Sequence, residues 1–182
     1  IEKTKISQGK LHIGCRTQTI YADDDYVPLL VFNGLFGGFS HSKLFRNVRE
    51  RESLAYYISS SIESHKGFMM IMSGIDFKHV NKTVTIIQDQ LDQVKKGQIT
   101  DEELNQTKAM LINQIKESND QPFQLMERMY HGIVGGKMRS GNQLMDQINK
   151  VRKEDVVKVA DKIQIDTIYF LTSNEVGEGD GL

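Results

Sequence analysis

The chain has 182 residues, 38% of them hydrophobic and 26% charged, which is typical of a folded globular domain and excludes a disordered segment. The formal net charge is −1, so no overall positive field would attract nucleic acid or an anionic membrane surface. Cys15 is the only cysteine, which excludes an intrachain disulfide and favours a reducing, cytoplasmic location.

The first elements in chain order are a strand and a buried helix. Residues 10–16 alternate polar and apolar side chains, the pattern of a half-buried strand. Three aspartates, Asp23 to Asp25, precede Pro28 where a helix is expected to begin. Residues 29–36 are apolar on nearly every side, so we expect this helix to lie between layers and to end at Gly37-Gly38. The apolar stretch is too short to span a bilayer, and no membrane segment is expected.

A second helix and a hairpin follow. Ser40 or Ser42 is expected to cap the helix, which carries Val48 on its inner face. Residues 54–61 and 68–75 are strand-like runs joined at His65-Lys66-Gly67, which predicts an antiparallel hairpin.

The rest of the chain is mainly helical. Apolar residues repeat at alternating spacings of four and three from residue 80 to residue 94, the pattern of an amphipathic helix: Val80, Val84, Ile87, Leu91 and Val94. Thr100 with Glu103 forms a capping box that opens the next helix. Pro122 opens another helix, a short one follows near Ile148, and a last helix precedes a strand at 167–172.

This segregated order of strands and helices predicts an α+β fold, a mostly antiparallel sheet with helices packed on one face. We expect a single domain over residues 1–182, with its core at 9–173 and a mobile tail at 174–182, because the tail is polar and rich in glycine. The charged run that begins at Ile1 suggests a fragment of a longer, two-domain protein.

No familiar catalytic motif occurs in the sequence. The five histidines are widely spaced, neither H-E-x-x-H nor H-x-x-E-H is present, and we expect no metal or other cofactor in this chain. The histidines are interpreted as surface or turn residues. There is no G-x-S-x-G elbow or P-loop, and Cys15, on a predicted strand, is interpreted as a small buried thiol.

Arg49 and Tyr56 form the one constellation that favours a chemical role. Arg49 ends a predicted helix, and Tyr56 opens the next strand seven residues later. A guanidinium and a phenol at one sheet edge can donate hydrogen bonds to a peptide carbonyl, or to the oxyanion that forms when the carbonyl is attacked. The alternative is an arginine in a surface ion pair and a tyrosine packed on a helix.

Four segments resemble a known family, in this order: Leu35-Phe36-Gly37-Gly38, Ser42-Lys43-Leu44-Phe45, Val48-Arg49-Glu50 and Leu54-Ala55-Tyr56. They are similar to the carboxy-terminal-type, non-zinc domain of the pitrilysin/insulinase peptidases, in the bacterial branch that resembles the processing peptidases. Lys43 stands where the family usually has Arg, and Ser53 where it usually has Gly.

The resemblance implies that the full protein has two related domains with different roles. The amino-terminal one carries the H-x-x-E-H zinc chemistry, and the second supplies an Arg and a Tyr, here Arg49 and Tyr56, that hold the substrate backbone. This chain alone is then expected to be inactive, with no catalytic or metal residue of its own, and zinc is expected only in the amino-terminal domain.

Two functions follow from the resemblance. The first is the substrate-holding half of a zinc-dependent endopeptidase. The alternative is a domain of a catalytically inactive homologue that binds peptides or partners an active subunit. The expected partners are a peptide substrate and either the amino-terminal domain or a homologous subunit. A dimer is one of the expected arrangements.

Overall fold

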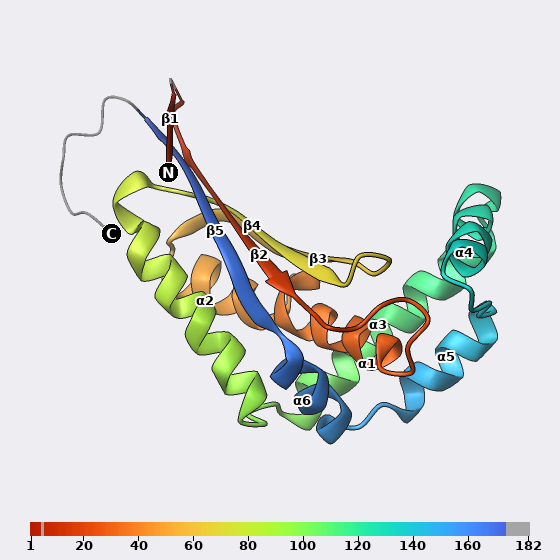
Figure 1. Cartoon of the computed structure of the whole chain (residues 1–182). Coiled ribbons are helices and arrows are strands. Elements are labelled where there is room, and N and C mark those ends of the chain that lie inside the picture. The colour runs from red at the N-terminus through yellow and green to blue at the C-terminus, as the bar shows by residue number, and fades with distance from the viewer. Residues whose placement is uncertain (5, 174–182) are drawn as a thin grey trace.

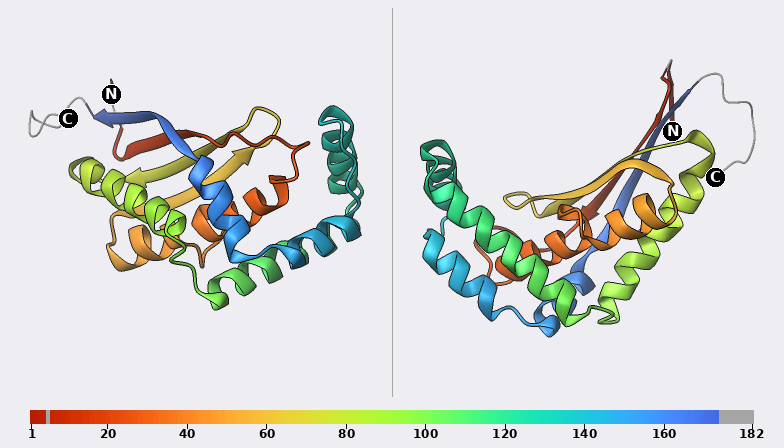
Figure 2. Two further views of the ribbon diagram at one scale, coloured as in Figure 1. Left: turned by 60° about the horizontal axis from the view of Figure 1, so that its bottom comes forward. Right: turned by 180° about the vertical axis from the view of Figure 1, so that it is seen from behind.

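The computed structural model describes residues 1–4 and 6–173 and shows an α+β fold, with helices gathered on one side of a twisted sheet (Figures 1 and 2). The fold class expected from the sequence is therefore confirmed. The tail at 174–182 lies outside the described residues. In the described part of the chain, no helix is long and apolar enough to cross a membrane.

In the described residues the sheet has five strands, in the order β1-β5-β2-β4-β3. They are β1 (Glu2–Thr4), β2 (Gly9–Arg16), β3 (Ala55–Glu63), β4 (Phe68–Ile75) and β5 (Gln164–Ser173). The pairs β2–β4, β2–β5 and β3–β4 are antiparallel, and β1 pairs with β5 in parallel. The hairpin β3–β4 was predicted. Strand β1 was not, because its charged residues lack the alternation that marks a half-buried strand.

The described residues form six α-helices, of which α4 stands beyond the end of the sheet (Figure 1): α1 (Tyr26–Asn33), α2 (Val80–Lys95), α3 (Asp101–Asn119), α4 (Pro122–Val134), α5 (Gly141–Lys150) and α6 (Lys153–Lys162). Two π-helical turns, Gly34–Gly38 and Phe45–Arg51, and the 3₁₀ turn Phe77–His79 complete the helical segments. The capping box of α3 is confirmed, since the Glu103 backbone N–H donates to Thr100 Oγ1 at 3.1 Å and Thr100 N–H donates to Glu103 Oε2 at 2.9 Å.

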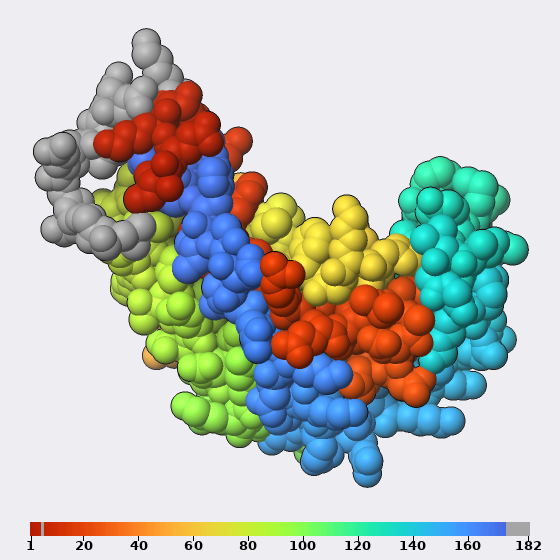
Figure 3. Space-filling model, in the orientation of Figure 1, coloured from red at the N-terminus to blue at the C-terminus, as the bar shows by residue number. Residues whose placement is uncertain are grey.

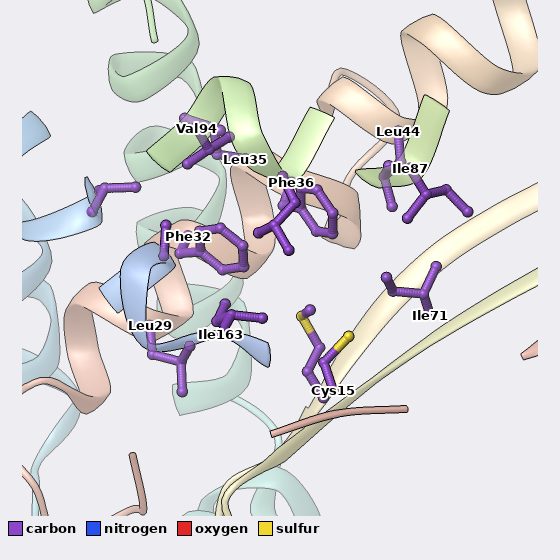
Figure 4. Close-up of a cluster of buried hydrophobic side chains, with 14 of the residues drawn as sticks. Cys15, Leu29, Phe32, Leu35, Phe36, Leu44, Ile71, Ile87, Val94 and Ile163 are labelled. Atoms are coloured by element: carbon purple, nitrogen blue, oxygen red, sulfur yellow. The ribbon is translucent and has the colours of Figure 1, made fainter. Parts of the chain in front are cut away.

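The core lies between the sheet and the helices (Figure 4). Phe32 and Phe36, both with 0% exposure, stack with ring centroids 5.2 Å apart, so the helix predicted to lie between layers does so. Ile87 of α2 and Ile71 of β4 belong to the same buried cluster, and Ile87 is fully buried, as its apolar spacing predicted. Cys15 is 1% exposed, which confirms the small buried thiol expected from the sequence, and burial raises the pKa of the thiol to about 11.

The helices leave the opposite face of the sheet open along much of its length. In Figure 3 the molecule is hollowed between the upper end of the sheet and α4, with the β3–β4 hairpin along the floor of the hollow. His12 and Tyr169 lie on this face, with ring centroids 6.2 Å apart. The candidate site described next is at the edge of the sheet formed by β3.

Candidate functional site

Arg49 lies in the π-helical turn Phe45–Arg51, which leads into β3. The wider turn is visible in the hydrogen bond from Glu52 N–H to the Asn47 carbonyl, five residues back, at 3.3 Å. The Arg49 guanidinium lies over the ring of Phe45, 4.7 Å from its centroid, and is exposed. Within residues 1–4 and 6–173 it has no carboxylate partner, so its donors are available to a ligand.

The connection from this turn to β3 passes through a left-handed residue. Ser53 has φ +51°, in the region that favours glycine, and the Leu54 N–H then donates to the Val48 carbonyl at 3.0 Å. The resembling family usually has glycine at this position. The fold therefore keeps the tight turn that the family glycine would make, at the cost of some backbone strain.

Tyr56 is the extra residue of a β-bulge. Ala55 pairs with Ile75 and Tyr57 with Gly74, so Tyr56 has no partner on β4. Strict alternation would send one of two adjacent tyrosines into the core. The bulge instead leaves Tyr56 66% exposed and Tyr57 41% exposed.

Arg49 and Tyr56 thus lie on adjoining elements, both exposed, at the edge strand of the sheet. In the described part of the chain no hydrogen bond, ring contact or cation–π contact joins the two side chains. The alternative of a surface ion pair for Arg49 and helix packing for Tyr56 receives no support from these contacts. Whether the pair converges on a peptide carbonyl stays a prediction.

A small cavity of about 170 Å³ beside Tyr56 brings in Asp76, which the sequence did not single out, and His79, one of the five histidines interpreted as surface or turn residues. Asp76 and His79 line it, and the Lys78 backbone N–H donates to Asp76 Oδ1 at 3.3 Å. That hydrogen bond lowers the pKa of Asp76, so the carboxylate is ionised at neutral pH. His79 Nδ1 is buried and has no hydrogen-bond partner in the described residues. The only signal for Asp76 in the sequence was its place between a strand and a helix.

The described residues contain no group of three or more His, Cys, Asp or Glu side chains that could hold a metal ion. The fold does bring together two histidines that are far apart in the sequence. His65 Nε2 lies 2.7 Å from His131 Nδ1, and the two rings stack with centroids 5.0 Å apart. Two imidazoles fall short of the three protein ligands of a catalytic zinc site. The sequence interpretation of these two as separate surface or turn residues missed their contact.

Comparison with known proteins identifies the family. Residues 1–111 match the family model described as the Peptidase M16 inactive domain. The chain therefore belongs to this family, the inactive, carboxy-terminal-type domain of the pitrilysin peptidases. The resemblance noted in the sequence is confirmed.

Two curated relatives come from Bacillus subtilis strain 168. The chain is 47% identical over 175 residues to the "Probable inactive metalloprotease YmfF", covering 96% of this chain and 41% of that protein. It is 27% identical over 157 residues to the "Uncharacterized zinc protease YmxG", covering 85% of this chain and 38% of that protein. The chain thus spans about two fifths of the length of these relatives.

Solved structures share the fold. A conserved protein from Enterococcus faecalis V583 matches with a TM-score of 0.90 and 39% identity, covering 98% of this chain and 42% of that one. An inactive peptidase domain from Bordetella parapertussis matches with a TM-score of 0.74 and 13% identity, covering 93% of this chain and 96% of that one. The second solved chain consists almost wholly of this fold and is described as the inactive peptidase domain of a putative zinc protease.

Proposed function

We propose that this chain is the non-catalytic domain of an M16-type protein without peptidase activity, which binds peptides or partners an active subunit. The observation that carries the proposal is the 47% identity, over 96% of the chain, to a protein described as a probable inactive metalloprotease. The domain itself belongs to the inactive-domain family, so its contribution is binding rather than bond cleavage.

The second candidate is the substrate-holding half of an active zinc endopeptidase. The 27% identity to an uncharacterized zinc protease supports it. The two candidates differ in one feature of the protein that carries this domain, namely whether its amino-terminal domain has an intact H-x-x-E-H motif. Zinc content of that longer protein, measured by metal analysis, separates them.

The site adds a physical reason for peptide binding under either candidate. Arg49 presents a permanently charged donor with no carboxylate partner among the described residues, and Tyr56 presents a phenol on a bulged edge strand. An extended peptide beside an edge strand offers carbonyl oxygens that such donors bind. We propose that Arg49 and Tyr56 hold the peptide backbone.

The test is peptide affinity measured by fluorescence anisotropy, with the 182-residue chain and a fluorescein-labelled unfolded peptide as the probe. Arg49→Ala removes a charge-assisted hydrogen bond of about 1.5–3 kcal/mol, so we expect the dissociation constant to rise by roughly 10–150-fold. Tyr56→Phe removes a neutral hydrogen bond of about 1 kcal/mol, and we expect a rise of roughly fivefold.

The chain supplies a matched control for each variant. Arg46→Ala removes an exposed arginine from the same turn, and Tyr57→Phe removes the hydroxyl of the adjacent tyrosine. Neither control residue is assigned to the peptide site, so both control variants should bind the peptide with a dissociation constant within about twofold of that of the unmodified chain. Equal losses in variants and controls would contradict the assignment of the site. Undetectable peptide binding by the unmodified chain would contradict the binding role itself.

A further inference from the structure

Helix α4 is joined to the β3–β4 hairpin by a pair of histidines. His65 lies in the turn of the hairpin, and its Nε2 is 2.7 Å from Nδ1 of His131 in the last turn of α4. The other side-chain hydrogen bonds of α4 in the described part of the chain join residues at most 10 positions apart in the sequence. Among the described residues, the histidine pair is therefore the one hydrogen bond from α4 to a distant segment.

The two imidazole rings are held in place by Tyr21. Its ring stacks on that of His65 with centroids 5.4 Å apart and on that of His131 with centroids 6.5 Å apart. Tyr21 is 4% exposed, and its backbone N–H donates to the Ser64 carbonyl at 2.9 Å. The Arg139 guanidinium lies over the Tyr21 ring, 4.9 Å from its centroid. A fixed aromatic ring thus positions both imidazoles, so their contact is part of the packing of the domain.

The chemistry of the pair makes this contact depend on pH. A hydrogen bond between two imidazoles needs one nitrogen that donates and one that accepts. Both nitrogens of a protonated imidazole are donors, so the bond survives the first added proton and is lost on the second. The second proton also places two positive charges side by side, and these repel. Histidine is the side chain whose charge ordinarily changes between about pH 5 and 8.

The groups around the pair do not compensate a second positive charge. In the described residues neither His65 nor His131 forms an ion pair with a carboxylate. The carboxylates and cations nearby balance each other. The titratable and charged groups that contact the rings, line the adjoining cavity or follow in the hairpin turn are Tyr21, Tyr26, Tyr130, Glu63, Glu117, Glu127, Lys66, Arg128 and Arg139.

The segment that contains α4 has a place to bend. Gly135 and Gly136 follow the helix directly, and Gly136 has φ +68° with no atom within 4 Å of the position that a Cβ would take. Beyond them Arg139 is anchored, because its guanidinium donates to the Tyr21 carbonyl at 2.6 Å and to the Asp23 carbonyl at 3.0 Å. Helix α4 thus lies between the end of α3 and a fixed point, with a glycine pair between the helix and that point.

We propose that His65 and His131 form a pH-sensitive clasp, which holds α4 on the hairpin at neutral pH and releases it when both imidazoles are protonated. The turn of the hairpin points toward α4 (Figures 1 and 2). A cavity of about 780 Å³ lies between α3, α4 and the end of the hairpin, and His131 lines it. Release of the clasp moves one wall of this cavity, so pH controls how open the cavity is.

The test measures the distance from the hairpin to α4 by double electron–electron resonance, with nitroxide labels at Ser61→Cys and Met126→Cys. Both positions are exposed, whereas Cys15 is buried and burial raises the pKa of its thiol to about 11, so it stays unlabelled. We expect a narrow distance distribution at about pH 7.5 and a broad, longer one at about pH 5.5. The released fraction should rise roughly tenfold, the order expected for the loss of one hydrogen bond.

Three variants separate protonation from shape. His65→Gln and His131→Asn each place an amide near the imidazole nitrogen that makes the bond, and an amide can donate and accept without taking up a proton. Both should keep the narrow distribution at both pH values. His65→Ala removes the partner and should give the broad distribution already at about pH 7.5. His12→Gln, on the open face of the sheet, is the matched control and should leave the pH response unchanged.

Four results would overturn the clasp. The first is an unmodified chain whose distance distribution is the same at both pH values, and the second is a pH response that persists in His65→Gln. The third is a His65→Ala variant that stays closed at about pH 7.5. The fourth is a loss of far-UV circular dichroism of the whole domain over the same pH range, because α4 would then be released by global unfolding.

Discussion

Replacing Ser53 by glycine should stabilise this domain, although most substitutions destabilise a protein. Ser53 holds φ at +51° in the turn between Arg49 and β3. A left-handed conformation costs an L-residue roughly 1–2 kcal/mol, and glycine avoids that cost. Glycine also loses about 0.5–1 kcal/mol more conformational entropy on folding than alanine. The net gain expected for Ser53→Gly is therefore about 0.5–1 kcal/mol.

The assay is equilibrium urea unfolding, with the slope m unchanged between variants. For a domain of this size the gain corresponds to a rise in melting temperature of about 1–4 °C. Ser61→Gly is the matched control, because Ser61 is exposed within strand β3 and the same substitution there should destabilise by about 0.5–1 kcal/mol. Ser53→Val should also destabilise, since a β-branched side chain fits a positive φ poorly. If Ser53→Gly destabilised the domain as much as Ser61→Gly, the reasoning from backbone strain would be refuted.

Two further predictions test the layering and the α3 cap. Ile87→Ala should destabilise the domain by about 2–5 kcal/mol, because Ile87 is fully buried. Thr85 is exposed on the same helix, so Thr85→Ala should change the free energy of unfolding by no more than about 0.5 kcal/mol. Urea unfolding measures both variants, and equal effects would contradict the layering. Burial alone would raise the pKa of Glu103, but the hydrogen bonds from Thr100 and Lys43 outweigh it and lower that pKa. The stability from Glu103 should then be complete above its unfolded pKa of about 4.3 and be lost as pH falls through the lower folded pKa. Glu103→Gln should flatten this acid dependence in unfolding measured against pH, and an unchanged profile would contradict it.

The secondary structure could be predicted because its signals are local. The alternation in β2, the apolar spacing of α2 and the Thr100 capping box each depend on residues within a few positions of one another. These signals also fix which face of an element is apolar. The resemblance to a family placed Arg49 and Tyr56 as candidates, and it pointed to Ser53 as the unusual residue in the turn between them.

The geometry of the site depended on tertiary contacts. The bulge that leaves both Tyr56 and Tyr57 exposed is defined by the register in which β3 pairs with β4. The sequence of one strand does not specify that register, so the bulge could not be predicted from β3 alone. Strand β1 forms only because β5, at the other end of the chain, offers a free edge.

Helix α4 shows most clearly what the sequence decided and what it did not. Its sequence determined that a helix begins at Pro122 and that it has an apolar arc and a polar arc. Only the tertiary structure decided that the polar arc faces the domain, because His65 and Asn119 come close to it through the packing of the hairpin and α3. Periodicity defines the two faces of a helix, but which face is covered depends on partners that are distant in the sequence.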